Sequence, residues 1–273
     1  MNVTRKPVHS PSALYLEPLS LVGMDRWLDN CFGQARDQIS PHKLPRIFFR
    51  ADDVAIPDTN ILRLMRLFQT YRIPLALAVI PAWMTPDRWT AFQEMDRNSP
   101  DLWMWHTHGW RHVNHEPDGK KQEFGPSRMT DMLTSDLENG LKRLARILSD
   151  RLTRVFTPPW NRCDDRTMSH LKRLGYVAIS RYRNSLPTVP PGIVDIPVNV
   201  DLHTRREPIP LDGWHALGLE LLQGLVSGQC GVMIHHTRMD DAAFVFLDRL
   251  LSRVNKSDWL RPVHLYPPIQ FSE

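Results

Sequence analysis

The chain has 273 residues, of which 42% are hydrophobic and 23% are charged, and its formal net charge at pH 7 is +4. This composition is typical of a globular protein and excludes disordered and fibrous classes, and no apolar run approaches the roughly 18 residues that span a bilayer. The mild positive charge comes without a recognised nucleic-acid-binding motif, so we expect no nucleic-acid partner and no membrane partner.

Residues 1–43 are predicted to form an N-terminal extension with one short helix at 24–38. From residue 44 onward, apolar runs typical of buried strands alternate with segments whose apolar residues recur every three or four positions, as in helices. The segment at 127–150 is either one helix or two helices broken near Gly140. Strands are expected at 46–53, 73–81, 101–106, 154–159, 176–180, 193–203 and 231–236, and helices at 59–72, 86–97, 127–150, 164–176, 215–227 and 241–254.

The alternation of strands and helices predicts an α/β fold. Strands joined by helices lie parallel in one sheet, and about seven such strands favour a distorted or incomplete parallel (β/α) barrel. An open, doubly wound sheet is the alternative. Because no linker or repeat interrupts the pattern, residues 44–273 are expected to form a single domain.

Polar residues stand where the predicted strands end. The carboxyl ends of parallel barrel strands face one mouth, where catalytic groups gather. Charged groups at the ends of buried strands are costly unless they are paired or bind a metal. The agreement of several strand ends therefore predicts a polar site at this mouth. The residues concerned are Asp52, Asp53, His106, His108, residues 157–162, Asp201, His203, His235 and His236.

Four histidines fall between residues 105 and 116, namely His106, His108, His112 and His115. His108 and His112 are four positions apart, so one helical turn or a tight loop can direct both imidazoles at one ion. An aspartate from the first strand supplies a third ligand, which leaves one position open for water, as in catalytic zinc sites.

These residues, in this order, resemble the motifs of the polysaccharide deacetylase superfamily, carbohydrate esterase family four, over about residues 45–255. The Asp-Asp pair at 52–53 is similar to the first motif of the family, and the two histidines in 108–112 are similar to the second. The segment Thr-Pro-Pro-Trp at 157–160 resembles the third motif. The strand ending in histidine at 232–235 resembles the last.

The resemblance implies that Asp53, His108 and His112 bind one divalent metal ion, that Asp52 is the general base and that His235 is the general acid. It implies hydrolysis of an N-acyl amide on a sugar or small molecule, with the metal and a backbone N–H stabilising the oxyanion. Zinc is the expected ion, and Co, Ni, Mn or Fe suit the same ligands.

Several positions depart from the family pattern, and the usual Asp-x-x-Asp-Trp is at best partly matched around Asp195 and Asp201. Arg-Ala-Asp-Asp-Val replaces the usual Thr-Phe-Asp-Asp-Gly, and Gly109 replaces the usual serine or threonine after the first ligand histidine. Thr157 stands where the third motif carries an arginine that holds the catalytic aspartate, and Arg50 and Arg162 are the candidate substitutes.

The roles of several neighbours stay open at this point. Adjacent side chains on a strand face opposite sides, so only one of His235 and His236 can serve, and we choose His235. The other candidates either contact substrate or orient the ligands, or else only pack, cap a helix or lie in a polar loop. They are Trp160, Asn161, Arg162, His106, His115 and His236.

Two alternative functions are compatible with the same barrel fold. One is a catalytically silent carbohydrate-binding relative, although a binder has no need of Asp52 and His235 beside the metal. The other is a metal-dependent hydrolase of another barrel superfamily, whose members often carry His-x-His on the first strand; here the only such pair, His106 and His108, lies later.

Compartment and assembly are less constrained. Cys31, Cys163 and Cys230 are odd in number and far apart, which indicates neither a disulfide framework nor a cysteine-rich metal site. The first residues lack the apolar core of a secretory signal, so a cytoplasmic protein is predicted. Nothing in the sequence indicates the oligomeric state.

Overall fold

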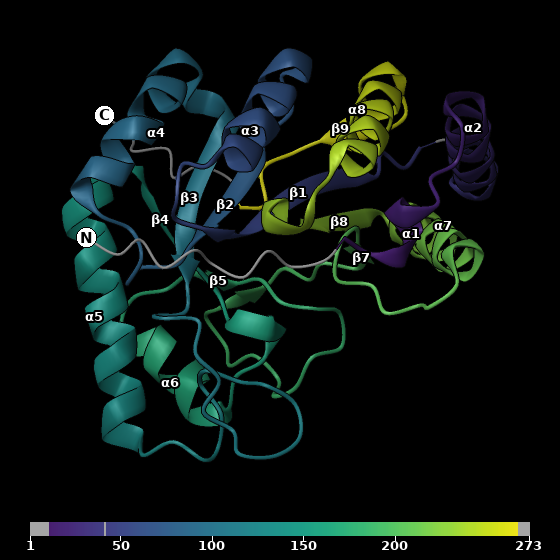
Figure 1. The fold of residues 1–273 in the computed structure, drawn as a ribbon. Helices are drawn as coiled ribbons and strands as arrows, with labels where there is room; N and C mark the ends of the chain where they lie inside the picture. The colour runs from purple at the N-terminus through teal and green to yellow at the C-terminus, as the bar shows by residue number, and fades with distance from the viewer. Residues whose placement is uncertain (1–10, 41, 267–273) are drawn as a thin grey trace.

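The computed structural model describes residues 11–40 and 42–266. Within this part of the chain, nine strands form one parallel sheet in the order β6-β5-β4-β3-β2-β1-β8-β7, with β9 beside β1 (Figure 1). The predicted parallel architecture in a single domain is therefore confirmed. The strands are β1 (Arg46–Val54), β2 (Leu75–Val79), β3 (Trp103–His108), β4 (Leu152–Thr157), β5 (Ala178–Ile179), β6 (Val194–Asp195), β7 (Val200–Asp201), β8 (Gln229–Ile234) and β9 (Arg261–Pro262).

One extended segment curls the sheet into the predicted distorted barrel. The N–H of Val198 donates to the carbonyl of Arg181 beyond β5, and the N–H of Asn199 donates to the carbonyl of Gly231 in β8, both at 2.9 Å. β6 and β7 lie on this segment, which the sequence predicted as one strand. Proline has no N–H to donate, and Pro197 lies where the pairing passes from β5 to β8.

Helices surround the sheet (Figure 1). The Asp58 side chain caps the start of α3 (Thr59–Tyr71), where its carboxylate accepts from the N–H of Ile61 at 2.9 Å. α5 (Thr130–Leu148) is one helix that continues through Gly140, where a Cβ would lie 3.2 Å from the carbonyl oxygen of Gly109. The helices are α1 (Ala13–Leu16), α2 (Leu21–Gln38), α3 (Thr59–Tyr71), α4 (Pro86–Asn98), α5 (Thr130–Leu148), α6 (Asp165–Arg173), α7 (Pro210–Ser227) and α8 (Asp241–Lys256).

The helical part of the predicted extension packs on the barrel. α2 is longer than the helix expected there and lies beside α7 and α8 (Figure 1). Leu28 and Phe32 are 0% and 4% exposed and belong to the same hydrophobic core as Phe49 of β1. The boundary at residue 43 stays a prediction.

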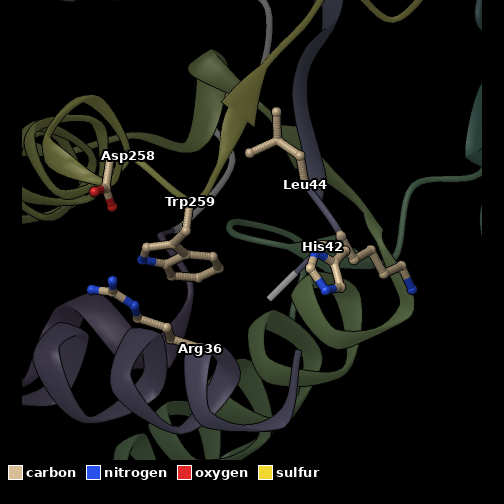
Figure 2. A pocket seen from close by; sticks show the side chains of 6 residues that line it. Arg36, His42, Leu44, Asp258 and Trp259 are labelled. Atoms are coloured by element: carbon tan, nitrogen blue, oxygen red, sulfur yellow. The ribbon is translucent and has the colours of Figure 1, made fainter. Parts of the chain in front are cut away.

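A hollow of about 230 Å³ lies at the amino-terminal edge of β1 and β9, opposite the edge where the polar strand ends meet. Figure 2 shows the indole of Trp259 among its lining residues. Those residues are Arg36, His42, Lys43, Leu44, Asp258 and Trp259. Among the helices of the described residues, none has the length and apolar character needed to cross a membrane.

Candidate metal centre and catalytic site

The end of β1 carries the two aspartates. Asp52 is 2% exposed and Asp53 is 9% exposed. The backbone of Asp53 has a φ of 63°, in the left-handed region, and the β1–β2 register shifts between Ala51 and Val54. This irregularity lets consecutive aspartates both serve the mouth of the barrel, which regular strand alternation would not allow.

His108, the last residue of β3, has a defined tautomer. Its Nδ1 lies 2.9 Å from the carbonyl oxygen of Thr157, and because a carbonyl can only accept, Nδ1 carries the proton. Nε2 therefore presents a lone pair. This Nε2 is buried without a hydrogen-bond partner in the described structure and lies 3.4 Å from Asp53 Oδ1. A carboxylate oxygen and an imidazole nitrogen at this distance require positive charge, carried either by a bound cation or by a proton on Nε2.

His112 brings a second imidazole to the same carboxylate oxygen. Its Nε2 lies 3.2 Å from Asp53 Oδ1, and the ligand atoms of Asp53, His108 and His112 all lie within 4.8 Å of one another. The residues from Gly109 to His112 form a loop rather than a helical turn. One carboxylate oxygen and two imidazole nitrogens form the donor set typical of a catalytic zinc-type site, so these residues fit a divalent cation.

Charge at this point agrees with that donor set. Burial alone would raise the pKa of Asp53, but the imidazoles of His108, His112 and His235 hold this pKa well below its usual range. Burial would lower the pKa of His108, but the carboxylates of Asp53 and Asp52 raise it. Both shifts show that positive charge is stabilised where the three side chains meet.

Arg50 binds Asp52 through both carboxylate oxygens. Its Nε and Nη2 donate to Oδ1 and Oδ2 at 2.8 Å each, its Nη1 donates to Ser180 Oγ at 2.9 Å, and its Nη2 also donates to Asn161 Oδ1 at 2.8 Å. Burial raises the pKa of Asp52, but the charges of Arg50, His108 and His235 lower it overall. Arg50, and not Arg162, thus holds the aspartate.

His235 and His236 diverge at the end of β8. His235 is half-buried, and it follows Ile234, which pairs with Ala51 across β1 and β8, so His235 lies beside the aspartates that end β1. Its charge lowers the pKa of both aspartates. Its Nδ1 is buried, with no hydrogen-bond partner among the residues described. His236 Nε2 instead lies 3.9 Å from Asp58 Oδ2 at the start of α3. The backbone N–H of His235 donates to His203 Nδ1 at 3.2 Å, which anchors the chain there.

The turn after β4 completes the site. The Trp160 ring lies 4.4 Å from the His112 ring, centroid to centroid, and Asn161 binds Arg50. Trp160 and Asn161 have φ of 54° and 59°, and with Asp53 at 63° and His112 at 58° they make four left-handed, non-glycine residues at one site. Such conformations cost about 1 kcal/mol or more each, and strain of this kind gathers at functional sites.

Thr157, which stands at the position of the third-motif arginine, contacts two histidines. Its hydroxyl lies 2.9 Å from His106 Nε2, and its carbonyl accepts from His108. Burial and the charge of Arg50 lower the pKa of His106 to about 3, so this imidazole is neutral. His106 is therefore linked to His108 through their shared partner Thr157.

Two other predicted residues lie outside this cluster. His115 is exposed on the loop after β3. Arg162 is half-buried, and its Nη1 donates to the carbonyl of Lys121 at 3.5 Å rather than to a carboxylate. Their part in substrate contact stays a prediction.

The sequence interpretation missed Ser180 and Glu123. Ser180 ends the predicted strand 176–180, so the same strand-end argument could have found it. Glu123 lies in a polar loop without periodicity, but it is 0% exposed, and its carboxylate accepts from the backbone N–H groups of Trp110 and Arg111, which lie between the candidate ligands His108 and His112. No sequence signal marks this residue.

The fold and the site together define a class of protein, namely β/α barrels that carry a carboxylate–imidazole cluster at the mouth. No family model and no curated protein sequence matches the chain. Among solved structures, a protein from Mycobacterium smegmatis described as a polysaccharide deacetylase has a TM-score of 0.63 and 14% identity, covering 83% of this chain and 89% of that one.

Two mutants of a carbohydrate esterase family four pseudoenzyme from Bacillus anthracis are also similar. One has a TM-score of 0.52 and 12% identity, covering 82% of this chain and 67% of that one. The other, with restored enzymatic activity, has a TM-score of 0.51 and 11% identity at coverages of 82% and 67%. The chain has the fold of the polysaccharide deacetylases, as the sequence resemblance implied.

Proposed function

We propose that this chain is a metal-dependent hydrolase that cleaves an N-acyl amide, a carbon–nitrogen bond other than a peptide bond, on a sugar or small molecule. The observation that carries the proposal is the meeting of Asp53, His108 and His112, with Asp52 and His235 beside them. The shared fold with proteins described as polysaccharide deacetylases supports this reaction class.

The metal ligands in this proposal are Asp53, His108 and His112, and zinc is the ion, with Co, Ni, Mn and Fe as alternatives. A divalent ion bound there would polarise the acyl carbonyl and lower the pKa of a water molecule. The remaining chemistry belongs to side chains of this chain.

Asp52 is the general base. Each of its oxygens accepts one hydrogen bond from Arg50 and keeps a further lone pair that can accept a proton from the attacking water. Because Arg50 holds the carboxylate by two bonds, its orientation is fixed before substrate binds. As the water oxygen bonds to the acyl carbon, its proton passes to Asp52.

His235 is the general acid. Breaking the carbon–nitrogen bond leaves an amine nitrogen that needs a proton, and the imidazole near both aspartates can donate one. The anchoring of its backbone by His203 keeps the ring at the mouth of the barrel. The products are a carboxylic acid and a free amine.

A catalytically silent carbohydrate-binding relative is the second candidate, because a pseudoenzyme has a similar fold. The two proposals differ in turnover and not in metal binding. A metal-loaded protein that binds N-acetylated sugars without releasing acetate from any of them would favour the silent relative.

The test is metal analysis of the wild type, Asp53→Ala, His108→Ala and Asp52→Asn, followed by acetate release from a panel of N-acetylated sugars and small molecules. We expect the first two variants to lose bound metal and Asp52→Asn to keep it while losing turnover. His115→Ala is the matched control for metal content, since this exposed histidine shares the loop but lies outside the cluster. Normal turnover by Asp52→Asn would refute its role as base.

A cytoplasmic location remains part of this proposal. Cys31, Cys163 and Cys230 are all free, and Cys163 and Cys230 are buried. Free thiols are usual in reducing compartments. Fractionation of cells that express the tagged chain tests the location directly.

A further inference from the structure

The loop between the two ligand histidines is held by a buried carboxylate. The backbone N–H of Trp110 donates to Glu123 Oε2 at 3.0 Å, and the N–H of Arg111 donates to Glu123 Oε1 at 2.6 Å. Residues 109–112 belong to neither a helix nor a strand, so no regular backbone hydrogen bonds hold them, and the bonds to Glu123 take that role. They fix the backbone immediately before His112.

Burying the Glu123 carboxylate costs free energy, because the charged group loses its hydration. It is 0% exposed, and within the described structure no lysine, arginine or histidine forms an ion pair with its carboxylate. A buried carboxylate is tolerated when hydrogen bonds replace its hydration, and here two consecutive amides do so. The two carboxylate oxygens of Glu123 therefore hold the loop.

The position of Glu123 is itself fixed by the barrel. The carbonyl of the next residue, Phe124, accepts from the N–H of Asp164 at 2.9 Å, and Phe124 forms a bridge with Cys163 after β4. Phe124 is 0% exposed and packs against Phe156 of β4. The carboxylate is thus carried by a segment tied to the strand that also supports His108.

Gly109 and Glu123 are sterically matched. Gly109 has a φ of 61°, and a Cβ at this position would lie 2.2 Å from Glu123 Oε2 and 2.5 Å from Pro159 Cγ. Glycine alone adopts this backbone readily and leaves room for the carboxylate. A serine or threonine at this position would collide with the carboxylate that holds the loop.

We propose that Glu123 is a positioning residue of the metal centre, whose carboxylate holds the 109–112 loop so that His108 and His112 converge on one ion. This inference rests on the proposed metal dependence, but not on the identity of the substrate. Hydrogen-bonding partners behind metal ligands typically contribute about 10- to 100-fold to metal affinity.

The experiment measures the Zn²⁺ dissociation constant of the metal-free full chain by competition with a chromophoric chelator, for the wild type and Glu123→Gln. Glutamine keeps the shape but points an N–H group at a backbone N–H. We expect affinity to fall about 10- to 100-fold, with kcat recovering at saturating Zn²⁺. The melting temperature of each metal-free protein is measured in parallel.

Glu116→Gln is the matched control, because Glu116 lies in the same loop and its carboxylate also accepts a backbone N–H, that of Ser127 at 3.2 Å. Its Zn²⁺ affinity should equal that of the wild type. Gly109→Ala is the second variant, since it disturbs the same contact from the loop side and should also weaken Zn²⁺ binding.

The outcomes separate the two proposals. Equal affinity in Glu123→Gln and wild type overturns the positioning role, and so does a loss of affinity that only accompanies unfolding of the metal-free variant. A wild type that binds no metal overturns this inference together with the proposed function. A wild type that shows the predicted Glu123 dependence but releases no acetate leaves the inference standing and refutes only the proposed reaction.

Discussion

Replacing Arg50 with methionine should destabilise the fold by about 3–5 kcal/mol, the usual cost of removing one partner of a buried ion pair. Arg50 and Asp52 have side chains that are 0% and 3% exposed and are joined at 2.8 Å. Without Arg50, the Asp52 carboxylate loses both of the hydrogen bonds and the ion pair that offset its lost hydration. At about 2–4 °C per kcal/mol, the melting temperature should fall by about 6–20 °C.

The assay is denaturant and thermal unfolding of Arg50→Met beside two comparison proteins. Arg181→Met is the matched control: Arg181 is equally buried, but its partner Asp195 is 37% exposed, so solvent can replace the lost cation and the destabilisation should be smaller. Arg50→Met/Asp52→Leu should regain most of the stability, because apolar pairs often replace buried ion pairs without loss. Wild-type stability in Arg50→Met, or a double variant no better than Arg50→Met, would refute the reasoning.

Three further measurements probe other parts of the structure. Burial raises the pKa of the Cys31 thiol to about 11, so its alkylation should accelerate about tenfold per pH unit from pH 7 to 10, and a pH-independent rate would contradict this. Phe32→Ala should lower the free energy of unfolding by about 3–5 kcal/mol, because Phe32 packs edge-on against Trp259. A decrease below about 1 kcal/mol would show that α2 is not part of the core. Asn161→Ala should be less stable than Asn161→Gly by about 1 kcal/mol. Both variants lose the hydrogen bond to Arg50, but a φ of 59° is strained for alanine and not for glycine. Equal stability of the two variants would argue against this backbone conformation.

The strands and helices were predictable where burial imposes a period. Buried runs such as 46–53 and amphipathic segments such as 59–72 lie where the sequence analysis expected them. The segment 193–203 was harder, because its apolar pattern is continuous while its pairing changes partner near Pro197. Pairing partners depend on the whole sheet and not on local periodicity.

The convergence of Asp53, His108 and His112 could be predicted because parallel strands end at one mouth. The pairing of Arg50 with Asp52 was also within reach, since residues two apart on a strand share a face. Glu123 was not, because its role depends on a loop folding back under another loop. The choice of His235 over His236 depended on the geometry after β8, where the chain turns toward Asp58.

The left-handed residues at the site bear on when it forms. An unfolded chain visits such conformations rarely at Asp53, His112, Trp160 and Asn161, because each carries a Cβ. The surrounding barrel therefore holds these angles in the folded chain. We accordingly expect uptake of the proposed metal to follow folding, and a chelator to remove that metal while leaving the fold in place.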